Sequence, residues 1–353
     1  MVEMSLNPES PKNYLGATIF WLYIIAALAF TAVTLQTLYR LKTSYHHHHH
    51  APKAQYNAAI RAFSILAGIS FTSLSFNMMH VLVQSFMKWC RNYDCLDTSV
   101  PSQGWLQTIW EWSVQSMQFQ DFGEAIVANP ARQLWTIAAL ANTLGVCIFI
   151  GFNGRQQQVP RLWAFFCLAE ILPISFAENL FYLALLLKVQ PVKGDAANRD
   201  IKNDKTLEKT PTLPVYDSLS LWYLPLYLAT GFCIGQASRA AGTSHLIPII
   251  FAARLVLLTP LSTWLHSSWG SVPFAVLKRF GHSMHINRLL GLIMCMLPVV
   301  GLRQTRSLDV QPLEALEALF EHPAVSTLGC DLVVSILGSV VWTVIAKEIG
   351  IHG

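Results

Sequence analysis

Four acidic residues lie inside stretches that are otherwise apolar, and they form two groups. Asp121 and Glu124 lie within residues 119–125, and Glu170 and Glu178 lie within residues 169–179. A carboxylate in hydrocarbon costs several kcal/mol unless it is paired, protonated or facing a polar cavity, so it marks a candidate site by default. We therefore expect an acid-lined pocket inside a membrane bundle.

The spacing of these acids suits the transfer of protons. On a helix, Asp121 and Glu124 share one face, whereas Glu170 and Glu178 are two turns apart and about 80° around the axis. Burial keeps a carboxylic acid neutral, and two nearby carboxyl groups separate their titrations so that one donates a proton while the other accepts one. All four acids are candidate catalytic residues, with Asp121 and Glu124 as the best pair.

Each group also has a purely structural interpretation. Asp121 and Glu124 would then decorate the polar face of an interfacial helix and pair with Arg132, since structural ion pairs are common. Glu178 and its neighbour Asn179 would form an interhelical hydrogen bond, which is the usual role of polar residues between membrane helices. Both interpretations stay open on the sequence alone.

Further polar and aromatic residues in these stretches are candidates for substrate contacts. Aromatic rings stabilise a positive charge by about 0.5–2 kcal/mol per well-placed contact, and rings near span centres are favoured over those at the interfaces. We assign substrate binding to Asn77, His80, Arg132, Trp135, Asn142, Phe176, Asn179 and Tyr227. Arg254 and Asp331 also lie in apolar stretches, and we expect them to pair and so to link two helices.

The elements that must position these residues are membrane helices. The chain has 53% hydrophobic and only 12% charged residues, too few charges to cover a surface that faces water. Its mean hydropathy is +0.41. Lys and Arg are spread over short connectors rather than one dense face, which argues against nucleic-acid binding. We expect an integral membrane protein of the endoplasmic reticulum, with the lipid bilayer as its surroundings.

A spanning helix needs about 20 mostly apolar residues, and by that rule we predict an all-α bundle of about seven or eight spans in a single membrane domain. The predicted spans are Ala17–Tyr39, Ala58–Met87, Leu134–Asn153, Leu162–Leu187, Leu219–Gln236, His245–Leu265, Leu289–Leu302 and Val325–Ala346.

Three connectors complete this organisation. The segment Trp89–Pro130 is rich in Trp and Phe among polar residues and is expected to form an interfacial or re-entrant helix pair. The segment Gln190–Pro214 alternates basic and acidic residues and is expected to be a hydrophilic loop. The segment Arg303–Pro323 has leucines at helical spacing opposite glutamates, which indicates an amphipathic surface helix.

Cofactor and metal motifs are absent from the sequence. The seven cysteines show no zinc-binding spacing, although Cys90 and Cys95 share one connector, where a disulfide depends on the membrane orientation. The tract His46–His50 lacks carboxylate partners, so we do not expect a specific metal site there. Because nucleotide-binding and hydrolase motifs are also missing, we expect no cofactor.

Several runs in the centre of the chain resemble a family of fungal integral membrane proteins of natural-product pathways. The runs are Phe119–Ala125, Arg132 with Leu134–Thr136, Gly154 and Arg155 with Leu162–Ala164, and Ser175–Leu183. They are similar to the membrane-bound terpene cyclases of ascochlorin and ascofuranone biosynthesis. Relatives in that family act on polyene epoxides of aurovertin- and citreoviridin-type pathways. The resemblance covers roughly Trp105–Leu187.

The resemblance implies acid-initiated opening of a lipophilic epoxide, followed by cyclisation of a terpenoid or polyene intermediate in fungal secondary metabolism. A neutral residue often stands in that family at the positions of Glu170 or Glu178, so these acids are expected to be specific to this chain. If one of them activates water, the reaction is epoxide hydrolysis instead of cyclisation. An alternative of another class is a proton-coupled transporter, because intramembrane acids and prolyl-broken helices are typical of such proteins.

Overall fold

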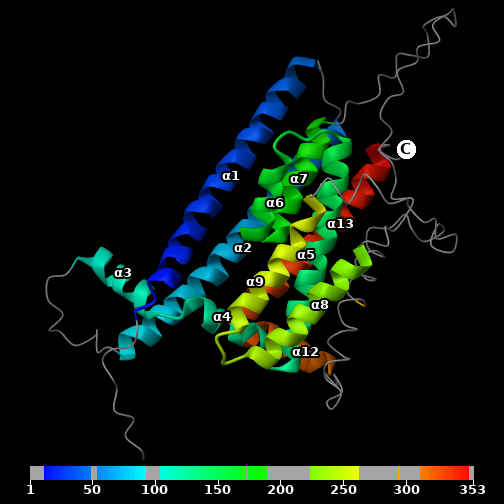
Figure 1. Cartoon of the computed structure of the whole chain (residues 1–353). Coiled ribbons are helices and arrows are strands. Elements are labelled where there is room, and N and C mark those ends of the chain that lie inside the picture. Colours follow the sequence, from blue (N-terminus) through cyan, green and yellow to red (C-terminus); the bar gives the residue numbers. More distant parts are fainter. Residues whose placement is uncertain are drawn as a thin grey trace, which may run out of the picture.

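The described part of the chain is helical throughout. The computed structural model describes residues 12–48, 54–92, 104–171, 173–188, 223–261, 293 and 311–349, and no strand occurs in these ranges (Figure 1). The prediction of an all-α fold is confirmed for this part of the chain. The predicted span Leu289–Leu302, apart from Ile293, and the predicted loop Gln190–Pro214 lie outside the described residues.

Four helices are long and apolar enough to cross a membrane. They are α1 (Tyr14–His48), α2 (Ala54–Asn92), α5 (Pro130–Gln156) and α13 (Pro323–Ile349). Many large apolar side chains on α1, α2 and α13, among them Leu28, Ile65 and Val344, are exposed. Such a surface suits contact with lipid, so a helical membrane protein is the class that the structure supports. Four of the predicted spans correspond to these helices.

Two shorter helices cover one side of α5. α8 (Tyr223–Ala240) descends along α5, since Tyr227 packs against Leu144 and the Ile234 carbonyl accepts a hydrogen bond from Gln133 near the start of α5. α9 (Leu246–Leu257) then returns in the opposite direction and continues into a 3-10 turn, η2 (Thr259–Leu261), beside Gly151.

The segment that was predicted as one span, Leu162–Leu187, forms two separate helices. α6 (Leu162–Ile171) runs antiparallel to α1, from Arg161, which bonds Gln36, to Ile171, which bonds Tyr23. α7 (Ile174–Lys188) runs back, and the Lys188 ammonium reaches the Gln158 carbonyl just before α6 at 3.2 Å. We call this unit the α6–α7 hairpin. The chain turns at Pro173 because proline cannot continue a helix without losing a hydrogen bond.

The α6–α7 hairpin supplies the centre of the hydrophobic core. Residues 174–186 of α7 are all buried, between α1, α2, α5, α6 and α13. Tyr182 stacks on Trp342 of α13 with ring centroids 4.7 Å apart, and both rings contact Phe63 of α2. A hairpin that is surrounded by long helices can carry polar residues deep into the bundle.

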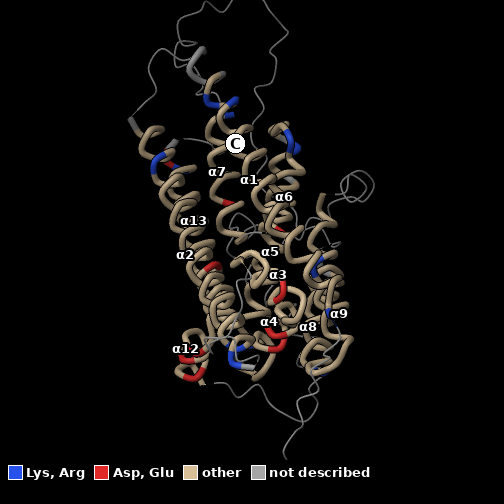
Figure 2. Tube along the Cα trace, turned by 90° about the vertical axis from the view of Figure 1, so that its left-hand side faces the viewer, with Lys and Arg blue, Asp and Glu red and all other residues tan. Residues whose placement is uncertain are grey.

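Short helices gather at the end of the bundle where α5 and α13 begin. They are α3 (Trp105–Gln115), α4 (Gln118–Val127) and α12 (Pro312–Glu321) (Figure 1). α3 exposes Trp105 and Trp110 while Trp112 packs inward, and α12 exposes Leu313 and Phe320. The predicted pair of non-spanning helices and the predicted amphipathic helix are therefore helices in the structure. Charged residues lie mostly toward the two ends of the bundle, with a few acidic segments and a basic segment on α9 between them (Figure 2).

Candidate functional site

The tip of the α6–α7 hairpin lies inside the bundle, about a third of the way along α13. It contacts Asp331 of α13, which is eight residues beyond Pro323 and therefore about 12 Å from the start of that helix at 1.5 Å per residue. The hydrocarbon core of a bilayer is about 30 Å thick. If α13 crosses such a core, the tip lies inside it.

Asp331 caps the amino-terminal end of α7. Its two carboxylate oxygens accept hydrogen bonds from the backbone N–H groups of Ile174 (3.0 Å) and Ser175 (2.9 Å), and the Ser175 hydroxyl donates a third at 2.5 Å. The first N–H groups of a helix have no partner within it, and they favour a negative charge. The expected pair between Asp331 and Arg254 is therefore not formed, because the helix start that Pro173 creates takes up the carboxylate instead.

Glu178 is the centre of a buried network of hydroxyl groups. Its Oε1 accepts hydrogen bonds from Tyr182 (2.7 Å) on the same helix and from Ser339 (3.0 Å) on α13, and its Oε2 accepts one from Ser335. Asn142 of α5 in turn donates to the Ser335 hydroxyl at 2.9 Å. The interhelical hydrogen bond of the structural interpretation is thus present for Glu178, and the network joins α5, α7 and α13.

Asn179, which follows Glu178, behaves differently. Its side-chain amide donates to the Ser175 carbonyl of its own helix at 2.7 Å, while its Oδ1 is buried without a hydrogen-bond partner among the described residues. A Cβ atom on Gly338 of α13 would lie 2.7 Å from that oxygen. Glycine at position 338 thus permits α7 and α13 to approach closely here.

Glu170 lies on α6 at the tip of the hairpin, and its carboxylate has fewer hydrogen-bond partners than that of Glu178. Its Oε2 lies 3.8 Å from the Arg254 guanidinium of α9, and its Oε1 is buried with no hydrogen-bond partner among the described residues. The Glu170 side chain is 12% exposed and that of Arg254 is 38% exposed. Of the acids deep in the described bundle, Glu170 therefore keeps an oxygen available, whereas Asp331 and both oxygens of Glu178 already accept hydrogen bonds.

The first predicted pair, Asp121 and Glu124, lies on α4 at the end of the bundle. Asp121 is 45% exposed and pairs with Lys88 of α2 at 3.6 Å, and Glu124 accepts a hydrogen bond from Gln120 at 2.8 Å. Within the described ranges, neither acid has a polar contact with the hairpin tip. The structure thus separates the two acid groups that the sequence placed in one pocket.

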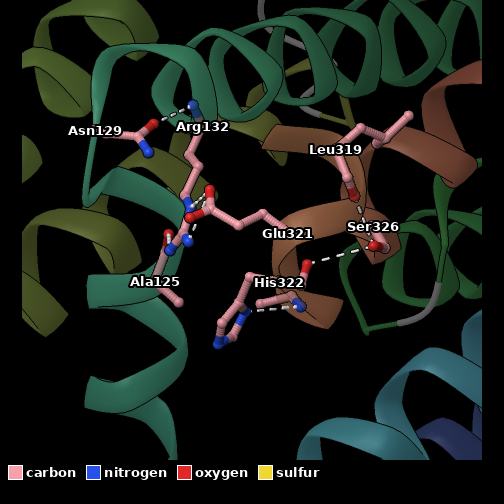
Figure 3. Close-up of polar contacts among 8 residues, drawn as sticks. Ala125, Asn129, Arg132, Leu319, Glu321, His322 and Ser326 are labelled. Atoms are coloured by element: carbon pink, nitrogen blue, oxygen red, sulfur yellow. Dashed lines mark hydrogen bonds and ion pairs between the residues drawn. The ribbon is translucent and has the colours of Figure 1, made fainter. Parts of the chain in front are cut away.

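Arg132 would pair with the acids of α4 in their structural interpretation, and the structure shows another partner. Its guanidinium lies 3.0 Å from Glu321 at the end of α12 and donates to the Ala125 carbonyl at 3.3 Å (Figure 3). Asn129 caps the start of α5, because its side-chain oxygen accepts a hydrogen bond from the Arg132 backbone N–H at 2.8 Å. The Arg132 side chain therefore joins α5 to α12 and α4.

The other predicted substrate contacts are dispersed over the bundle. On α2, Asn77 is half-buried and His80 is exposed and bonded to Gln84. Trp135 donates to the Ala315 carbonyl of α12 at 2.7 Å. Phe176 packs against Phe71, and Tyr227 lies in the cluster between α5 and α8. Only Asn142, Phe176 and Asn179 lie close to Glu178, in space or in sequence.

Sequence reasoning missed the residues of α13 that bond to Glu178, namely Ser335 and Ser339. Asp331, Ser335 and Ser339 recur every four residues in an otherwise apolar helix, and this spacing places them on one face. That polar stripe was a usable signal, because it predicts a helix that faces polar groups inside a bundle. Tyr23, which bonds the Ile171 carbonyl at the tip, carried no comparable signal.

Comparisons of the chain with protein-family models, with curated proteins and with solved structures found no match. Across the described ranges, no group of His, Cys, Asp and Glu side chains is arranged to hold a metal ion. Cys95 and the side chains of His46–His50 lie outside the described residues.

Proposed function

We propose that this protein is a membrane-bound enzyme that opens an epoxide by acid catalysis and cyclises a lipophilic terpenoid or polyene intermediate, with Glu170 as the acid. The observation that supports it most is the state of Glu170. It is a buried carboxyl group deep in the bundle that has one oxygen without a partner in the described structure. The central resemblance to fungal membrane-bound terpene cyclases supplies the reaction class.

In this proposal Glu170 donates its proton to the epoxide oxygen. A carbon–oxygen bond breaks, its electron pair stays on the oxygen, and a hydroxyl group forms while positive charge develops on carbon. An alkene or hydroxyl group of the same substrate attacks that carbon, and the proton that is finally lost returns to the Glu170 carboxylate. The product is an isomer of the substrate. Arg254, at 3.8 Å, stabilises the carboxylate between the two proton transfers.

Glu170 and Arg254 are reached from the surface of the bundle, and this access favours a lipophilic substrate. Arg254 is 38% exposed, and Tyr23 on the adjacent α1 is also partly exposed. A substrate dissolved in the bilayer would approach this surface at the depth of the hairpin tip. If water attacks the opened epoxide in place of an internal group, the same residues perform hydrolysis, which is the alternative outcome within this proposal.

One observation favours a second candidate, proton-coupled transport. A broken helix whose amino-terminal end lies inside the bundle is a recurrent feature of transporter sites. The break at Pro173 and the capped start of α7 have this form. In this alternative Glu170 would carry the proton.

The test uses detergent-purified protein with terpenoid and polyene epoxides in oxygen-18 water, and mass spectrometry of the products. We expect an unlabelled isomer from the wild type and a loss of turnover by a factor of about 100 or more in Glu170→Gln, because general acids contribute about that much or more. Glu317→Gln, on the exposed face of α12, is the matched control and should retain activity.

Other outcomes would redirect the proposal. Label in the product would mean hydrolysis. Loss of turnover in Asp121→Asn or Glu124→Gln, with Glu170→Gln still active, would move the acid to α4. No turnover by the wild type, together with uptake into sealed vesicles driven by a pH gradient, would favour transport.

A further inference from the structure

A single residue, His322, connects α12 to α13. α12 ends at Glu321 and α13 begins at Pro323. The His322 ring accepts a hydrogen bond at Nδ1 from the Ala324 backbone N–H at 3.1 Å (Figure 3). The His322 carbonyl accepts hydrogen bonds from the backbone N–H groups of Val325 (2.9 Å) and Ser326 (3.0 Å). His322 therefore caps the first turn of α13 with its side chain.

This cap works only with a neutral imidazole. Nδ1 must keep its lone pair to accept from Ala324, and a protonated ring carries hydrogen on both nitrogens. Protonation would also place a positive charge at the start of a helix, where the macrodipole disfavours it.

The charged groups around the ring come from three elements: Arg132 of α5, Glu321 of α12 and His80 of α2. Burial is the main cause that lowers the pKa of His322 below its ordinary value of 6.5, and Arg132 and His80 lower that pKa further while Glu321 raises it. The surroundings as a whole thus support the neutral ring that the hydrogen bond requires.

The junction between α12 and α13, at His322, contacts several other helices. The Ser326 hydroxyl donates to the Leu319 carbonyl of α12 at 2.6 Å (Figure 3). Ala324 and Val325 are fully buried, and Ala324 packs with Ala125 of α4 and Leu246 of α9. α13 then continues to Asp331 and Ser335, so a change in its first turn acts on the helix that holds the buried acids.

We propose that His322 is a pH-sensitive latch, which fixes α12 to the first turn of α13 when the ring is neutral and releases that turn when the ring is protonated. This inference does not depend on the proposed enzymatic function. It concerns the conformation of one end of the bundle and is measurable without a substrate.

The direction of the pH effect follows from the lowered pKa. The unfolded chain binds a proton at His322 at a higher pH than the folded protein does. The stability contributed by the neutral ring is therefore complete above about pH 6.5 and is lost as the pH falls from there through the folded-state value.

The test compares the wild type with His322→Asn, whose amide oxygen can accept from Ala324 at any pH. Thermal unfolding and hydrogen exchange of the Ala324–Ser326 amides, corrected for intrinsic rates, are measured at about pH 7.5 and about pH 5.5, on either side of the ordinary histidine pKa. We expect the wild type to lose melting temperature and protection at the lower pH, and His322→Asn to lose much less of both. His245→Gln, an exposed histidine just before α9 whose side chain makes no capping hydrogen bond, should keep the wild-type pH response.

An equal loss in His322→Asn would overturn the proposal, and so would unchanged protection of these amides in the wild type. If the Asn variant does not fold, nitrogen-15 histidine NMR of the wild type decides. Protonation of the His322 ring without a change at the Ala324 amide would refute the latch.

Discussion

Ser335 connects three helices through one hydroxyl group. It accepts a hydrogen bond from Asn142 of α5 and donates one to Glu178 of α7, while it belongs to α13 itself. Removal of the hydroxyl would leave the Asn142 amide and one Glu178 oxygen without this partner in a buried environment. An unsatisfied buried polar group is more costly than the mean value of a hydrogen bond suggests.

We predict that Ser335→Ala lowers the free energy of unfolding by about 1–3 kcal/mol. Ser64→Ala is the matched control, because Ser64 is exposed on α2 and donates only to the Ile60 carbonyl of its own helix. The control should stay within about 0.5 kcal/mol of the wild type. Denaturation in detergent measures both, and equal effects would show that the network does not stabilise the bundle.

For individual residues, the sequence indicated which polar side chains lie in apolar helices but did not predict which partners they contact. For Glu178, a hydrogen bond to another helix was one of two open interpretations, and that bond is present. Arg254 and Asp331 were expected to pair with each other, yet Arg254 pairs with Glu170 and Asp331 caps α7. Spacing along one helix determines the face on which a residue lies, but the order of helices in a bundle depends on contacts between residues more than 80 positions apart, which local patterns do not encode.

The α6–α7 hairpin depends on the Asp331 cap. Two backbone N–H groups at the start of α7 donate to this carboxylate inside the bundle, where water is scarce. We predict that Asp331→Ala destabilises the protein by about 1–3 kcal/mol for each N–H group left unsatisfied, while Asp331→Asn, which keeps one acceptor oxygen, costs less.

Asp121→Ala is the control for this substitution, since Asp121 is half-exposed and its pair with Lys88 is open to solvent. An exposed ion pair contributes about 0–1 kcal/mol, so the control should change thermal stability little. A small effect of Asp331→Ala, comparable to that of the control, would contradict the role of the cap.

The hairpin also shows that hydropathy does not distinguish one spanning helix from two shorter helices. The stretch Leu162–Leu187 has the length and composition of a span, and these properties are the same whether the chain crosses the bilayer or turns back within it. Pro173 marks the turn, but a proline in a membrane helix is also compatible with a kink. The direction becomes visible only through contacts with α1 and α13.

On the scale of the whole molecule, the hairpin places both of its ends on one side. Arg161 and Lys188 lie at the end of the bundle where α5 finishes, whereas Thr243 and Glu317 lie at the end where α5 and α13 begin. In a variant without the seven native cysteines, we predict that a membrane-impermeant thiol reagent labels Arg161→Cys and Lys188→Cys from the same side.

Thr243→Cys and Glu317→Cys are the controls and should be labelled only from the opposite side. Labelling of positions 161 and 188 from opposite sides would mean that the segment between them crosses the membrane. That result would restore the span predicted from hydropathy and would exclude the hairpin in the native protein.

The Asp331 cap sets an order for the biogenesis of the protein. A ribosome delivers Ile174 and Ser175 long before it delivers Asp331, which is 156 residues after Ser175. Until α13 has entered the bilayer, the start of α7 lacks the acceptor that satisfies it, and an unsatisfied N–H group in hydrocarbon costs several kcal/mol. We therefore expect the hairpin to take its place between the long helices only after translation has reached α13.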